Sequence, residues 1–354
     1  MATTKVTTDV IDMSGNAGGL TWVKGTTAQR TTTTIGDLRE DTDTKRTQVY
    51  TDQTGTAEWR NLKEEAVDNS FTVDYLIVAG GGGGGAYNGG GGGAGGLRTS
   101  YGSTTGLNLS IATSYTVEVG PGGAGQVSST QSVNGTESKF GIVGSEIIST
   151  GGGKGGGYTG SFYDGGSGGS GGGGAYSSGN SSPGTASPAG QGFAGGVGDG
   201  GTNSGGGGGA GSVGAAATSS KGGNGGSGIS YTNATSITGV AASYGGGGGG
   251  AGYPAGGGSA GTGSDGGGNG GANGVGTNGT PYTGGGGGGA QDTAFPPNNA
   301  GGTGGSGIVI LRYPSGNSIN VGSGLSTGVL NGTVSGGTDK YTTFTLGSGT
   351  ITFS

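Results

Sequence analysis

The chain has 354 residues, of which 105 are glycine, and its formal net charge is −6. Only 10% of the residues are charged, whereas an ordinary globular domain has about 25% charged residues and about 7% glycine. Cysteine and histidine are both absent, which excludes disulfides, thiolate metal sites and histidine-based catalysis. The negative net charge argues against a nucleic-acid ligand.

The N-terminal sequence has no apolar stretch of the kind found in signal peptides. No run of about 18 apolar residues is present either, so no transmembrane helix is expected. We therefore expect synthesis in the cytoplasm, with lysis or a dedicated route if the protein acts outside the cell.

Residues 1–68 are predicted to form a small β module. Short strands are predicted at residues 36–38, 48–50 and 57–62, separated by polar turns, and period-two alternation is visible in residues 47–50 and 57–60. Trp22, Tyr50 and Trp59 are the large side chains available for a core. So small a core is marginal on its own, which favours oligomerisation or docking on a larger body.

Residues 69–314 form the glycine-rich body. Of the 105 glycines, 89 lie in residues 75–306, and predicted strands at 71–79, 114–119, 146–150 and 306–313 border the glycine runs. Residues 315–354 are predicted as a C-terminal β module. Asn331 and Gly332 indicate a type I′ hairpin, and alternating residues at 341–346 and 350–353 indicate two strands.

A run of glycines that ends in one alanine recurs six times, which is typical of a repeat architecture. The last three spacings between these alanines are 35, 41 and 39 residues. The six alanines are Ala86, Ala94, Ala175, Ala210, Ala251 and Ala290.

Glycine runs of this kind predict packed polyglycine II helices. A polyproline-II-type helix has three residues per turn and no internal hydrogen bonds, so each backbone must be satisfied by its neighbours. Without Cβ atoms, such helices can approach closely enough to bond to one another. The fold class is thus expected to be all-β with a polyglycine II bundle. A disordered linker and another glycine-rich β structure are the alternatives, whereas collagen would need a strict period and more than eight prolines.

Two parts of the sequence resemble tailed-phage fibre proteins. Residues 25–30 (GTTAQR), 36–39 (GDLR) and 58–60 (EWR) resemble the N-terminal module of these fibres, although Thr31 replaces the usual proline and Glu40-Asp41 replaces Tyr-Asn. Residues 75–80, 134–141 and 307–314 resemble the glycine-rich domains of viral fibres and adhesins, especially those of marine phages. The resemblance implies polyglycine II helices that carry receptor-binding loops at one end.

Aromatic residues between the glycine runs are the candidate receptor contacts, because exposed aromatics on loops of a rigid scaffold commonly bind ligands. The alternative is that they close the ends of the glycine-rich body. The candidates are Tyr158, Phe162, Tyr163, Tyr176, Tyr253, Tyr282 and Phe295.

No catalytic, cofactor-binding or metal-binding residue is predicted. Asp164, Asp199, Asp265 and Asp292 occur singly, so nothing in the sequence pairs two carboxylates for glycoside hydrolysis. Lys154 lies between glycines but lacks the context of a phosphate-binding loop.

These features predict a structural virion fibre that attaches to the host and is not an enzyme. We expect a homotrimer anchored to other virion or baseplate proteins through residues 1–68. Its external partner would be a host surface glycan or an outer-membrane protein, bound through several sites at once. A non-viral surface filament and an ice-binding polyglycine II protein are the alternatives.

Overall fold

The computed structural model describes residues 23–25, 38–41, 46–51, 58–61, 69–102, 106–127, 130–157, 163–176, 181–292 and 299–354. The chain divides into two compact units, residues 1–68 and residues 69–354. The structure is all-β, and the only helix within the described ranges is the 3-10 turn η2 (Pro254–Gly256). Those ranges include no helix that is long and apolar enough to cross a membrane.

The N-terminal unit contains a four-stranded sheet in the order β1-β2-β3-β4. The pair formed by β3 and β4 brings Tyr50 opposite Trp59, two of the three large side chains named for the core, with ring centroids 5.4 Å apart. The strand expected at residues 36–38 lies at 38–41, and Trp22 is outside the described residues. The strands are β1 (Val23–Gly25), β2 (Leu38–Asp41), β3 (Arg46–Thr51) and β4 (Glu58–Asn61).

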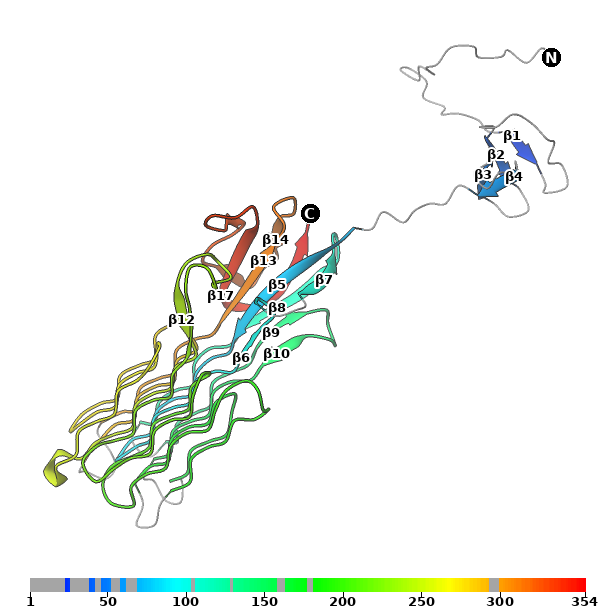
Figure 1. Cartoon of the computed structure of the whole chain (residues 1–354). Helices are drawn as coiled ribbons and strands as arrows, with labels where there is room; N and C mark the ends of the chain where they lie inside the picture. Colours follow the sequence, from blue (N-terminus) through cyan, green and yellow to red (C-terminus); the bar gives the residue numbers. More distant parts are fainter. Residues whose placement is uncertain are drawn as a thin grey trace, which may run out of the picture. The chain divides into compact units, whose positions relative to one another are not determined.

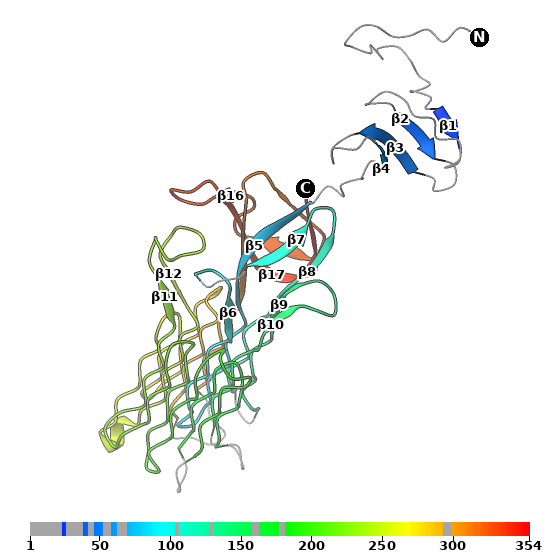
Figure 2. The ribbon, with the colours of Figure 1, turned by 45° about the vertical axis from the view of Figure 1, so that its right-hand side comes forward.

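The second unit is built on one large sheet, from which the glycine-rich segments extend (Figures 1 and 2). Its main path runs β10-β9-β8-β17-β13-β5-β6, and β14, β15 and β16 pair with β17, while β7 pairs with β5. The strands along the path are β10 (Ile147–Ser149), β9 (Ser138–Gly141), β8 (Ser114–Val119), β17 (Lys340–Phe353), β13 (Ile308–Tyr313), β5 (Ser70–Val78) and β6 (Leu97–Thr99). The others are β7 (Leu107–Ser110), β14 (Ile319–Val321), β15 (Leu325–Thr327) and β16 (Gly332–Thr333).

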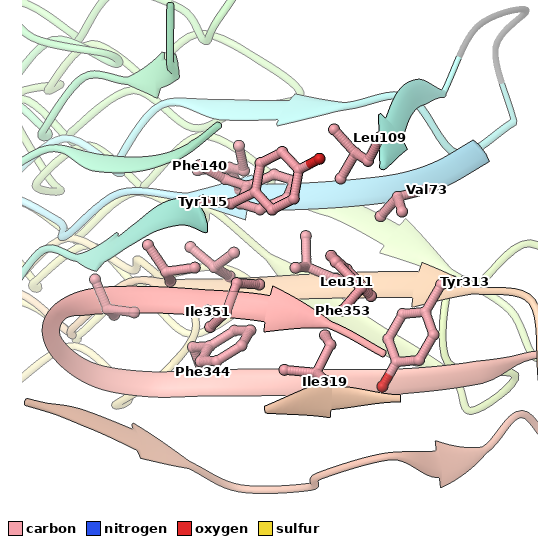
Figure 3. Close-up of a cluster of buried hydrophobic side chains, with 14 residues drawn as sticks. Val73, Leu109, Tyr115, Phe140, Leu311, Tyr313, Ile319, Phe344, Ile351 and Phe353 are labelled. Carbon is pink, nitrogen blue, oxygen red and sulfur yellow. The ribbon is translucent and has the colours of Figure 1, made fainter. Parts of the chain in front are cut away.

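The main hydrophobic core lies on one face of this sheet (Figure 3). Alternate residues of each strand point to the same face, so β8 buries Tyr115, Val117 and Val119 and leaves the residues between them less buried. Phe344 and Phe353 of β17 join them in the core. A smaller core on the opposite face includes Leu76, Val78 and Ile310, and the hairpin β11 (Ile229–Tyr231) and β12 (Ala242–Tyr244) covers part of it.

Residues 315–354 lie within this sheet, although they were predicted as a module of their own. β17 pairs with β13 and β8, because its apolar face needs the side chains of those strands for burial. It also runs unbroken through residues 347–349, where two strands were expected, since these residues stay paired with β8. Asn331 has the predicted left-handed φ of 52°, but β15 and β16 both pair with β17 and do not form the predicted hairpin.

The glycine-rich segments between residues 79 and 307, which we call the glycine bundle, run back and forth along one direction. β5 leads directly into residues 79–85, the chain turns at residues 86–88, and residues 89–96 return to β6. The turn at residues 86–88 therefore lies at the end of the bundle away from the sheet, which we call the far end. The bundle's other end adjoins the sheet.

The central run, residues 80–85, donates hydrogen bonds to its neighbours with a period of three residues. Each N–H group bonds to a carbonyl of another segment at 2.9–3.0 Å, and residues three apart bond to the same segment. Gly80 and Gly83 bond to Thr136 and Val133, Gly81 and Gly84 to Gly305 and Gly302, and Gly82 and Gly85 to Gly93 and Gly90. Three neighbouring segments thus accept all six hydrogen bonds.

The carbonyl groups of the same run accept hydrogen bonds from three further segments, again with a period of three. The donors are Gly152 and Gly155, Gly123 and Gln126, and Gly287 and Ala290, at 2.8–2.9 Å. Six segments therefore surround the run. A Cβ atom on any of its glycines would lie between 1.7 and 2.2 Å from a backbone oxygen of a neighbour, so no side chain fits.

Asparagine side chains complete this backbone bonding at the surface of the bundle. In four places an Oδ1 atom accepts a hydrogen bond from a backbone N–H of a neighbouring segment. These pairs are Asn134 with Lys154, Asn224 with Thr262, Asn269 with Gly263 and Asn278 with Thr303, at 2.9–3.0 Å. An amide side chain thus takes the place of a missing backbone partner.

Hydrogen exchange should distinguish this bundle from a disordered glycine linker. We expect the amides of residues 81–84 to exchange as slowly as those of β5, because each is buried and bonded to another segment. Native-state exchange measured by NMR or mass spectrometry tests this. Exchange of these glycines at the rate of an unstructured peptide would contradict the hydrogen-bond network.

Candidate functional site

The far end of the bundle brings together three of the predicted aromatic candidates. Tyr163, Tyr176 and Tyr253 all lie there and are all partly buried. Tyr282 lies at the opposite end, next to the sheet, where its N–H donates to the Ser306 hydroxyl at 3.0 Å. The candidates Tyr158, Phe162 and Phe295 lie outside the described residues.

Backbone and side-chain hydrogen bonds connect the loops that carry these tyrosines. The Asn88 carbonyl accepts a hydrogen bond from the Tyr176 N–H at 3.0 Å and another from the Ser204 hydroxyl. Next to Ser204, the Asn203 Oδ1 atom accepts from the Tyr253 N–H at 3.0 Å. Because these partners belong to the bundle, they fix where the backbones of Tyr176 and Tyr253 lie.

Several far-end residues were not singled out by the sequence pattern. Tyr87 and Asn88 form the turn between two glycine runs and have left-handed φ values of 55° and 54°. Buried amides also lie here: Gln126 accepts from the Ala86 N–H at 2.9 Å, and Gln291 is 1% exposed. Within the described part of the chain, the side-chain amide of Gln291 has no hydrogen-bond partner. A far-end surface therefore combines partly exposed rings with buried polar groups.

The four scattered carboxylates have structural roles in this arrangement. Each accepts a hydrogen bond from a backbone N–H of a loop or a neighbouring segment, at 2.7–2.9 Å. The pairs are Asp164 with Ser182, Asp199 with Gly201, Asp265 with Gly228 and Asp292 with Asn299. In the described ranges, no three acidic side chains come together in a group that could hold a metal ion.

A hollow of about 560 Å³ lies beside the sheet, at the end of the bundle opposite the far end. β6, β11 and the loop at residues 190–191 surround it, and Tyr75, Arg98 and Tyr231 are among its lining residues. Burial raises the pKa of Tyr75, and the neighbouring Arg98 acts in the opposite direction. Burial also lowers the pKa of Lys154, on the side of the bundle.

Comparison with known proteins assigns the body of the chain to a protein family. The profile of a family described as a glycine-rich domain matches residues 51–314, well over half of the chain. The matched region includes the glycine bundle and the strands β5, β8, β9, β10 and β13 that border it. No curated protein and no solved structure matches the chain.

Proposed function

Because the chain belongs to the glycine-rich domain family, we propose that its glycine bundle is a scaffold of packed polyglycine II helices. The three-residue period of hydrogen bonding in residues 80–85 supports this, since such a helix has three residues per turn. The six surrounding segments support it as well, because every backbone group of the run then has a partner.

The function we propose for this scaffold is adhesion through its far end. The observation that carries the proposal is that Tyr87, Tyr163, Tyr176 and Tyr253 gather there on loops connected by hydrogen bonds. Tyrosine rings offer a flat apolar face and a polar hydroxyl, which suits stacking on sugars or on loops of surface proteins. Hydrogen bonds to the bundle hold the backbones of Tyr176 and Tyr253 before binding, which lowers the entropy lost on binding.

The resemblance of residues 25–60 to phage fibre modules extends the proposal to a virus fibre. Residues 1–68 would anchor the chain to the particle, and several copies, as in a homotrimer, would bind the host cell together. Mass measurement in solution tests the assembly, and a stable monomer at micromolar concentration would contradict it. Antibody labelling of virus particles in electron micrographs tests the location.

We predict that the double substitution Tyr176→Ala and Tyr253→Ala reduces attachment by a factor of about 30 or more. Removal of aromatic anchors at the centre of a binding surface commonly costs at least about 2 kcal/mol. The measurement is flow cytometry of fluorescently labelled full-length protein on a panel of bacterial cells.

The matched control for this prediction is Tyr282→Ala at the sheet end, where the side chain is 49% exposed. It should leave attachment unchanged. An equal loss of attachment with both variants would show that the far end is not the binding surface. If the wild-type protein attached to no cell type in the panel, that result would count against adhesion.

A further inference from the structure

The chain contains seven asparagines that are directly followed by glycine: Asn88, Asn134, Asn224, Asn269, Asn273, Asn278 and Asn331. In such a pair the glycine nitrogen can attack the side-chain carbonyl carbon of asparagine, because no side chain shields it. A carbon–nitrogen bond forms, the bond to the amide nitrogen breaks and ammonia leaves. Water then opens the succinimide and yields aspartate or isoaspartate, so a neutral residue becomes an anion.

In the glycine bundle, hydrogen bonds hold both groups that must react, which are the asparagine side-chain amide and the N–H of the following glycine. The Oδ1 atoms of Asn134, Asn224, Asn269 and Asn278 accept backbone hydrogen bonds. The following glycine in each case donates its N–H to a carbonyl of a neighbouring segment. These bonds join Gly135 to Gly152, Gly225 to Thr262, Gly270 to Gly261 and Gly279 to Thr303, at 2.8–2.9 Å.

The other two protected pairs are held in different ways. Asn331 accepts hydrogen bonds from the Tyr313 hydroxyl and the Ile319 N–H, both at 2.7 Å. Asn88 is buried at the far end, and the N–H of Gly89 donates to the Ala290 carbonyl at 3.0 Å. Attack at either position therefore requires local unfolding.

Asn273 lacks this protection. It is exposed in a far-end turn with a left-handed φ of 56°. Among the described residues, nothing bonds to its side chain or to the N–H of Gly274. A Cβ atom added to Gly274 would meet nothing within 4 Å, so this peptide has open space around it.

We propose that Asn273 is a modification site at which the folded protein deamidates ahead of its other Asn-Gly pairs. The product would place a negative charge at the far end, next to the loop of Gln291, whose N–H bonds to the Gly274 carbonyl at 3.1 Å. The bundle thus protects the asparagines along its surface from deamidation and leaves one reactive Asn-Gly pair at its far end.

Peptide mapping by mass spectrometry, after incubation of the full-length protein at mildly alkaline pH, tests the proposal. Breaking two hydrogen bonds of ordinary net strength reduces the reactive population by a factor of about 30. Asn273 should therefore deamidate at least about 30 times faster than Asn134, Asn224, Asn269 and Asn278. In guanidinium the difference should disappear, because unfolding exposes every pair.

The variant Gly274→Ala supplies a second test, since a methyl group fits there and hinders attack by the nitrogen. It should slow conversion of Asn273 and leave the other asparagines unchanged. The proposal is overturned if a bundle asparagine converts as fast as Asn273 in the folded protein. An unchanged Asn273 rate in Gly274→Ala would overturn it as well.

Discussion

Replacing Gly82 by alanine is expected to destabilise the second unit by about 5 kcal/mol or more, beyond the usual cost of overpacking. The new Cβ atom would lie 2.2 Å from the Gly153 oxygen and 2.5 Å from the Gly153 carbonyl carbon. Both are backbone atoms, so no side-chain rotation relieves the contact. Gly153 is itself held by hydrogen bonds to Gly93 and Ser170, at 2.7 and 2.8 Å. Thermal unfolding followed by calorimetry measures the effect.

Gly274→Ala is the matched control, because its methyl group meets nothing within 4 Å. The same change in side chain should alter the free energy of unfolding by less than about 1 kcal/mol, through the entropy of the unfolded chain. If the midpoint temperature of unfolding of Gly82→Ala lay within a few degrees of the wild-type value, the bundle could open to admit a side chain. That result would contradict close packing of residues 80–85.

Composition could predict that glycine segments pack together, but it could not predict which segments are neighbours. Residues 80–85 bond to six segments drawn from residues 90–305, and all of these contacts are between backbone atoms. A backbone contact carries no side-chain pattern, so the pairing leaves no periodic signal comparable to that of β8. The asparagine contacts are the exception, since Asn269 and Asn278 occupy the surface positions where a backbone partner is missing.

The candidate site was predictable in part, through a signal that lay in the repeat itself. Ala86, Ala175 and Ala251 end glycine runs that point away from the sheet, and a tyrosine follows each of them within two residues. That order places Tyr87, Tyr176 and Tyr253 at the far end. Tyr282 instead precedes a glycine run and therefore lies at the sheet end. Aromatic character alone could not distinguish the far-end tyrosines from Tyr282.

Replacing Phe353 by alanine is expected to destabilise the second unit by about 3–5 kcal/mol. Its side chain is 1% exposed and lies in the same core as Tyr115 and Tyr313 (Figure 3). Its ring centroid is 5.0–6.0 Å from those of Phe71, Tyr115 and Tyr313. The substitution therefore leaves a cavity among three aromatic rings and removes edge-to-face contacts. Urea unfolding of the full-length protein measures the loss, and Leu346→Ala in the same strand is the control, because Leu346 is 54% exposed.

The Phe353 variant also tests whether the sheet and the glycine bundle unfold together. β5 continues into residues 79–85 and β13 follows residues 299–307, so these two bundle segments are continuous with strands whose core includes Phe353. We expect the amide protection of the glycines to fall by the same free energy as that of the strands. If glycine protection stays at the wild-type level while the sheet is weakened, the bundle folds independently, and its order does not depend on the sheet.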